Sequence, residues 1–159
     1  MFRIGFGTDI HRLVAGRPLV IGGVAIESDL GADGHSDADV LMHATADAVL
    51  GSLALGDLGT HFPNDEERWK NAPSDQFLAY AVGLVREKGF RIVNLDAVVD
   101  LERPKLRPFI DQMRENIANV LDIEMSCVSV KAKTGEGVDA VGERRAIRAQ
   151  AIVLVSDEG

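Results

Sequence analysis

The sequence predicts an α+β domain in which helices cover one face of a mixed β-sheet. Three observations lead to this prediction. Segments with strand-like alternation occur near both ends of the chain and between the helices, the apolar positions of other segments follow helical spacing, and no repeat or long linker divides the 159 residues. Because a chain of this length can bury one sizeable core, we assign residues 1–159 to a single domain.

The first strand is predicted at residues 2–11, where apolar side chains alternate with small or polar ones. Phe6 and Ile10 point to one side with the other apolar residues, and Asp9 and His11 leave the opposite side. This alternation is typical of a strand with one buried face.

The central helix is predicted to begin at Ser36, because Asp39 three residues later completes an S-x-x-D capping pattern. The helix runs to about Leu55, and Gly56 is placed to end it. The Gly-, Pro- and Asp-rich stretch 56–73 is predicted to be a long loop. Loops of this length in compact domains are usually functional or mobile.

The remaining elements follow from the same two periodicities. They are a short strand or hairpin at 18–26, a helix at about 74–88, a strand at 93–101, a turn at R-P-K-L-R-P, a helix at about 108–121, and strands at 128–132 and 147–155. The order β-β-α-α-β-α-β-β places the helices on one sheet face. The other face then needs a cover, which oligomerisation supplies naturally.

The composition argues against several classes of function. The formal net charge is −8, whereas binding to nucleic acid needs clustered Lys and Arg, so no nucleic-acid partner is expected. No apolar run reaches the roughly 18–20 residues of a membrane span, and no secretory signal is evident. We therefore expect no membrane partner and a cytoplasmic location. The single cysteine, Cys127, excludes an intrachain disulfide, which fits a reducing compartment.

Two motifs contain candidate metal ligands. In T-D-I-H, Asp9 and His11 leave the same face of a strand, and a carboxylate with an imidazole suits zinc or another first-row divalent metal. A surface Asp–His hydrogen bond is the alternative. In G-H-S-D-A-D-V-L-M-H, His43 shares a helical stripe with Asp39 and Asp47, which suits a ligand oriented by carboxylates. The alternative is a partly exposed histidine in a ladder of helical salt bridges.

Other motifs contain polar groups suited to a phosphorylated ligand. His35 and Ser36 lie at the expected helix N-terminus, where free N–H groups favour a phosphate, although simple capping is the alternative. Asp57 and Gly59 lie in a Gly-rich loop that could bind sugar hydroxyls or form an ordinary turn.

A last pair of motifs, R-P-K-L-R-P and K-A-K-T-G-E-G, brings Lys105 and Lys133 to loops at strand ends. Thr134 adds a hydroxyl, and Glu136 is a candidate ligand for a second metal. Two solvated turns are the alternative.

Taken in order, the motifs T-D-I-H, G-H-S-D-A-D-V-L-M-H, A-L-G-D-L-G-x-x-F-P, R-P-K-L and V-K-A-K-T-G-E-G resemble the 2-C-methyl-D-erythritol 2,4-cyclodiphosphate synthase family over essentially the whole chain. The resemblance implies a phosphorus–oxygen lyase of the non-mevalonate isoprenoid pathway. Such an enzyme converts 4-diphosphocytidyl-2-C-methyl-D-erythritol 2-phosphate, a cytidine diphosphate substrate, to the cyclic diphosphate and CMP. It also implies a homotrimer with active sites at the subunit interfaces. A zinc-dependent phosphohydrolase and a non-catalytic nucleotide- or metal-binding module are the competing hypotheses.

The resemblance also implies a role for each site residue. Asp9, His11 and His43 would hold one Zn²⁺, or another first-row divalent metal, per subunit, and Glu136 would help to bind Mg²⁺ or Mn²⁺ with the substrate. The other expected site residues are His35 and Thr134, as transition-state stabilisers, and, as substrate contacts made partly through the backbone, Ser36, Asp57, Leu58, Gly59, Phe62, Pro63, Asn64, Asp65, Glu66, Leu101, Lys105, Leu106, Ala132 and Lys133.

The chain departs from the usual family pattern in three places, one of which is K-T-G-E in place of T-T-T-E, with Lys133 in the region expected to contact cytosine. F-P-N replaces F-P-D, so whether Asn64, Asp65 or Glu66 holds the methylerythritol stays open. Ala140 and Glu143 stand where the family commonly has Phe and Arg, in a segment that lines a central trimer cavity able to hold an isoprenoid diphosphate. The missing cation argues against this second ligand here.

Overall fold

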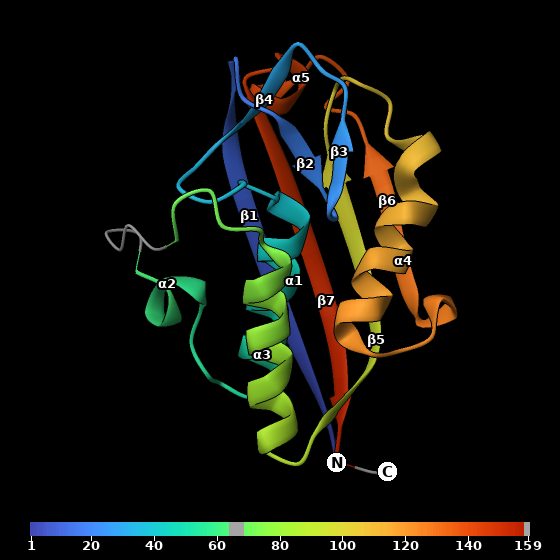
Figure 1. The fold of residues 1–159 in the computed structure, drawn as a ribbon. Coiled ribbons are helices and arrows are strands. Elements are labelled where there is room, and N and C mark those ends of the chain that lie inside the picture. Colours follow the sequence, from blue (N-terminus) through green and yellow to red (C-terminus); the bar gives the residue numbers. More distant parts are fainter. Residues whose placement is uncertain (64–68, 158–159) are drawn as a thin grey trace.

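Five strands form the main sheet, and three long helices lie on one of its faces (Figure 1). The computed structural model describes residues 1–63 and 69–157. In spatial order, the strands are β4 (Leu30–Asp33), β1 (Phe2–Ala15), β7 (Ala146–Ser156), β5 (Arg91–Asp100) and β6 (Val128–Lys133). All pairs are antiparallel except β5 with β6, which is parallel. The predicted α+β class with a mixed sheet is therefore confirmed.

The remaining elements are a short hairpin, the helices and short 3₁₀ turns. β2 (Leu19–Ile21) and β3 (Val24–Ile26) form the expected short hairpin. The helices are α1 (Val40–Ser52), α2 (Leu58–His61), α3 (Asp75–Glu87), α4 (Ile110–Leu121) and α5 (Asp139–Gly142), with 3₁₀ turns at Arg107–Phe109 and Met125–Cys127. α1 contacts β1 and β7 on one side and α3 on the other, so it lies inside the core.

β1 alternates as predicted, but over residues 2–11 its buried face is the one that carries glycines and polar side chains; apolar Leu13 joins this face only beyond the predicted strand. Gly5 and Gly7 face α1 so closely that a Cβ added to them would lie 1.8 Å from the Ala48 carbonyl oxygen and 2.1 Å from the Ala44 carbonyl oxygen, respectively. The opposite side of the sheet is open. Its large apolar side chains, between 49% and 69% exposed, are Phe2, Ile4, Phe6, Ile10 and Ile152.

The start of α1 differs from the prediction, because Asp39 and not Ser36 is its N-cap. Ala38 has a φ of +56°, which is not helical, and the Asp39 carboxylate accepts hydrogen bonds from the amides of Leu41 and Met42. The backbone amide that the Ser36 hydroxyl accepts is that of Ala38, which precedes the helix. The helix also ends three residues before the predicted Leu55.

The long helices α3 and α4 and the strands after residue 90 match their predicted positions within about two residues. Three short elements were not predicted: β4, which pairs with the end of β1, and the four-residue helices α2 and α5. α2 lies within the predicted loop 56–73, and the carboxylate of its N-cap, Asp57, accepts the Thr60 amide at 2.9 Å. None of these three has a long enough pattern to stand out in the sequence.

Candidate metal centre and cavity

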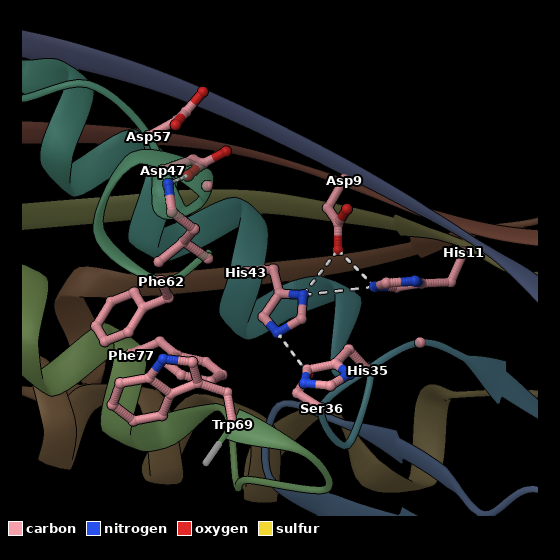
Figure 2. Close-up of a pocket in the computed structure, with 13 residues that line it drawn as sticks. Asp9, His11, His35, Ser36, His43, Asp47, Asp57, Phe62, Trp69 and Phe77 are labelled. Atoms are coloured by element: carbon pink, nitrogen blue, oxygen red, sulfur yellow. Dashed lines mark hydrogen bonds and ion pairs between the residues drawn. The ribbon is translucent and has the colours of Figure 1, made fainter. Parts of the chain in front are cut away.

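Asp9, His11 and His43 meet where α1 crosses β1 (Figure 2). Asp9 Oδ2 lies 2.9 Å from His11 Nε2 and 3.0 Å from His43 Nδ1. The two histidine nitrogens are 3.4 Å apart. The absence of a side chain at Gly7 allows α1 to lie directly on the strand, which brings His43 to the Asp9–His11 pair.

The three ligand atoms suit a zinc ion. One carboxylate oxygen and two imidazole nitrogens are common zinc donors, and the ligand atoms of a tetrahedral site with bonds of about 2.0–2.2 Å lie roughly 3.4 Å apart. The separations between 2.9 and 3.4 Å approach this value. The outer nitrogen of His11, Nδ1, lies 3.0 Å from the Asp33 carbonyl oxygen and donates to it, so the lone pair of Nε2 faces the cluster. The donor set and its orientation therefore fit the metal.

The cluster also perturbs the acidity of its members. Burial raises the pKa of the Asp9 carboxyl, but hydrogen bonds from His11 and His43 outweigh burial and hold this pKa well below its usual range. Burial lowers the pKa of His11, and the hydrogen bond and charge of Asp9 outweigh it, so the net pKa is raised. Asp9 is thus ionised across the physiological range, and a metal competes with a proton for His11.

Carboxylates on α1 have other tasks than the predicted orientation of His43. Asp39 is fully buried and also accepts the amides of Gly22 and Gly23, at 2.9 and 2.7 Å. Asp47 accepts the Leu58 amide at 2.8 Å and so holds the start of α2 against α1. Burial raises the pKa of Asp47. The expectation that both acids orient His43 is therefore wrong.

A cavity of about 370 Å³ opens beside the cluster. Its lining includes nine residues predicted for the site: Asp9, His11, His35, Ser36, His43, Asp57, Leu58, Gly59 and Phe62. Gly34, Asp47, Trp69 and Phe77 complete it. In Figure 2 the rings of Phe62, Trp69 and Phe77 form one wall, with ring centroids 4.7 to 5.7 Å apart. No pattern in the sequence pointed to Trp69, which lies between α2 and α3, or to Phe77, which lies in the first turn of α3.

The other predicted residues lie elsewhere in the chain. Across the sheet, Asp9 of β1 pairs with Ala149 of β7, Ala149 pairs with Val99 of β5, and Val99 pairs with Ala132 of β6. With strands about 4.8 Å apart, Ala132 is about 14 Å from β1 across the sheet. Together with Ala132, the residues at the far end of β5 and β6 are Leu101, Lys105, Leu106, Lys133, Thr134 and Glu136, and none of them lines this cavity.

This far group has a structure of its own. Leu101 and Leu106 are buried, and the Leu101 amide donates to the Lys133 carbonyl oxygen at 2.9 Å. The Thr134 hydroxyl donates to Glu136 Oε1 at 2.5 Å. Exposed Pro63 lies outside the cavity lining. The predicted contacts Asn64, Asp65 and Glu66 fall outside the described residues.

Comparison with known proteins identifies the family. The model of the YgbB family matches residues 2–156. The chain belongs to the YgbB family. A relative named 2-C-methyl-D-erythritol 2,4-cyclodiphosphate synthase, from Salinibacter ruber, is 56% identical over 153 residues, which cover 96% of this chain and 98% of the relative. The family membership and enzyme class expected from the motifs are thereby confirmed.

Solved structures of similar sequence share the fold. A 2C-methyl-D-erythritol-2,4-cyclodiphosphate synthase with bound CDP is 38% identical, with a TM-score of 0.90, and the match covers 97% of this chain and all of the other. The bifunctional IspDF from Campylobacter jejuni is 37% identical with a TM-score of 0.93, and the match covers 98% of this chain but 42% of that longer one. Among the described residues, no helix is long and apolar enough to cross a membrane.

Proposed function

We propose that this chain converts 4-diphosphocytidyl-2-C-methyl-D-erythritol 2-phosphate to 2-C-methyl-D-erythritol 2,4-cyclodiphosphate and CMP. The observation that carries the proposal is the Asp9–His11–His43 cluster at the wall of a cavity that also presents His35, Ser36 and Asp57. The full-length similarity to relatives named for this reaction supports it.

In this reaction the substrate supplies its own nucleophile. An oxygen of the 2-phosphate forms a bond to the β-phosphorus, the bond from that phosphorus to the bridging oxygen breaks, and its electron pair leaves with CMP. No water and no protein nucleophile is consumed, so the chain contributes positioning and charge stabilisation.

Asp9, His11 and His43 would hold one zinc ion, and the exposed carboxylate of Glu136 would help to hold Mg²⁺ or Mn²⁺. Bound divalent ions supply charge neutralisation at phosphate oxygens, which offsets the repulsion between the phosphates and an acidic chain. His35 faces the same cavity and is assigned to stabilising the developing negative charge.

The remaining cavity walls suit the two ends of the substrate. The Ser36 hydroxyl is placed to donate to a phosphate, and the Asp57 carboxylate with the Gly59 backbone is placed to bind ribose hydroxyls. The aromatic wall that includes Phe62 and Trp69 limits the access of water to the reacting phosphates. Exclusion of water favours cyclisation over hydrolysis.

We further propose a cytoplasmic homotrimer whose active sites lie between subunits. Two features support this arrangement. The open sheet face carries a row of large apolar side chains, among them Phe2, Ile4 and Phe6, of the kind that an interface covers. Thr134 and Glu136, assigned to the same reaction, follow a strand about 14 Å from β1, so a second copy must supply them to the cavity.

The reaction is tested by phosphorus NMR of the products formed from this substrate with zinc and magnesium present. Cyclic diphosphate with CMP is expected. Ring-open products of water attack would support a phosphohydrolase instead, and binding without turnover would support a non-catalytic module.

The shared site is tested by subunit complementation. His43→Ala and Thr134→Ala each remove one half of the proposed site, so each homotrimer should be inactive. In mixed trimers, some interfaces combine an intact His43 from one subunit with an intact Thr134 from its neighbour. Partial recovery of CMP release on mixing is expected, whereas a site contained within one chain predicts no recovery at any mixing ratio.

A further inference from the structure

A chain of hydrogen bonds runs from His43 away from the cavity. His43 Nε2 lies 2.7 Å from the Ser74 hydroxyl oxygen, and that hydroxyl in turn makes a short hydrogen bond to Asp37 Oδ1. Ser74 is 1% exposed and is not part of the cavity wall. The Asp37 carboxylate is fixed by two backbone amides, those of Ser74 at 2.9 Å and Asp39 at 3.1 Å.

The direction of these hydrogen bonds is set by the carboxylate. An ionised Asp37 can only accept, so the Ser74 hydroxyl must donate its one hydrogen to it. The Ser74 oxygen can then only accept from His43, which requires the proton of the neutral imidazole to be on Nε2. The lone pair of His43 Nδ1 is thereby directed at Asp9 and His11, which is the orientation that a metal ligand needs.

A second hydroxyl near His43 does not alter this assignment. The Ser36 oxygen lies 3.2 Å from His43 Nε2, farther than that of Ser74, and it accepts the Ala38 amide. With Nε2–H committed to Ser74, the Ser36 hydroxyl hydrogen is left to face the cavity. The two serines therefore have different tasks, although both are buried beside the same nitrogen.

The position of Ser74 in α3 supports a role beyond local structure. Ser74 is the N-cap residue of α3, where a serine hydroxyl ordinarily accepts a backbone amide of the first turn. This hydroxyl makes no capping hydrogen bond. Its hydrogen bonds go to His43 and Asp37, so the side chain serves the metal centre and not the helix.

We propose that Ser74 and Asp37 are positioning residues for the metal centre, which fix the tautomer and orientation of His43 for a divalent metal. This inference rests on the proposed zinc site. Partners of this kind typically change metal affinity by about 10–100-fold when removed. Neither residue touches the substrate cavity, so their effect reaches the reaction only through His43.

The test measures zinc affinity of the intact protein by competition with a chromophoric chelator. Ser74→Ala is expected to raise the zinc Kd by about 10–100-fold. The segment around Ser74 should stay in place, because the amides of Asn71 and Ser74 still bond the His35 carbonyl and Asp37. Ser52→Ala is the matched control, since Ser52 is a buried serine of α1 whose hydroxyl donates to the Val49 carbonyl oxygen of its own helix.

Asp37→Asn tests the direction of the hydrogen bonds and serves if Ser74→Ala does not fold. An amide that donates to Ser74 turns the serine hydroxyl toward His43 and moves the imidazole proton to Nδ1, which faces the metal. We expect weaker zinc binding and an altered visible spectrum of the cobalt-substituted protein. Adding Asp37→Asn to Ser74→Ala should change the zinc Kd by no more than about twofold, because Asp37 acts through Ser74.

Three outcomes would overturn the inference. If both single variants bind zinc within about twofold of Ser52→Ala, the two residues do not position the ligand. If their effects on Kd simply multiply, they do not act as one chain. A wild-type protein that binds no zinc would refute the metal site itself, and so would separate that failure from failure of the positioning role.

Discussion

Gly7→Ala tests whether the approach of α1 to β1 builds the metal centre. The added Cβ would lie 2.1 Å from the Ala44 carbonyl oxygen, and real Cβ atoms essentially never approach closer than 3.0 Å, so helix and strand must separate by nearly 1 Å. His43 directly precedes Ala44 and would move with it. Metal sites tolerate ligand displacements of about 0.2 Å, so we expect zinc affinity to fall by more than about 100-fold.

The same substitution should destabilise the fold. Overpacking of a close contact lowers the free energy of unfolding by about 1–3 kcal/mol, and by more when backbone atoms are involved. In a chain of this size, a loss of about 3 kcal/mol lowers Tm by about 6–12 °C. Thermal melts and chelator competition measure the two effects. Gly83→Ala in α3 is the control, because nothing lies within 4 Å of its added Cβ, and it should gain about 0.5–1 kcal/mol. Wild-type Tm and zinc affinity for Gly7→Ala would refute the reasoning.

Four further predictions concern the buried acid Asp39 and the metal centre. Asp39→Ala should lower the free energy of unfolding by about 3 kcal/mol, because the N-cap of α1 is lost and buried amides such as that of Gly22 lose their acceptor. A urea titration in which the free energy of unfolding falls by less than about 1 kcal/mol would contradict this prediction. At a pH below the raised pKa of His11, zinc must displace a proton from this side chain, so the zinc Kd should fall as the pH rises from about 6 to 8. Calorimetry that finds no proton release on zinc binding would count against this prediction. In the metal-free protein, the lowered pKa of Asp9 stabilises the fold above about pH 4, and this stability is lost on acidification. The raised pKa of His11 stabilises the fold below about pH 6.5, and this stability is lost as the pH rises through the pKa of His11 in the folded state. The Tm of the metal-free protein should therefore be highest between about pH 4 and about pH 6.5. Removal of the metal by a chelator should abolish turnover, while circular dichroism shows that the chain stays folded.

Elements with long amphipathic patterns could be predicted from the sequence, and elements set by distant partners could not. α3 and α4 have 12 or 13 residues with a regular apolar stripe. The start of α1 depends on Asp39, whose carboxylate also binds the turn between β2 and β3, 16 residues earlier. The buried face of β1 depends on the helix that covers it, because Gly5 and Gly7 allow a backbone contact that no hydrophobicity pattern records.

In the candidate site, too, single residues could be predicted from the sequence, but their meeting in space could not. The motifs indicated Asp9, His11 and His43 one by one, and the meeting of a strand with a helix 34 residues later became visible only in the fold. Asp37 lies inside the G-H-S-D-A-D-V-L-M-H motif, but in the sequence both it and Ser74 look like ordinary turn or cap residues. Their relation to the metal centre depends on the docking of two loops.

CMP release measured during a zinc titration of metal-free protein, with magnesium and substrate present, tests the central claim most directly. We predict no release without zinc, a rise in proportion to added zinc that ends at about one equivalent per chain, as a single three-ligand site requires, and no recovery for His43→Ala. Release at full rate without zinc, or equal rates for wild type and His43→Ala, would contradict the proposed metal-centred reaction.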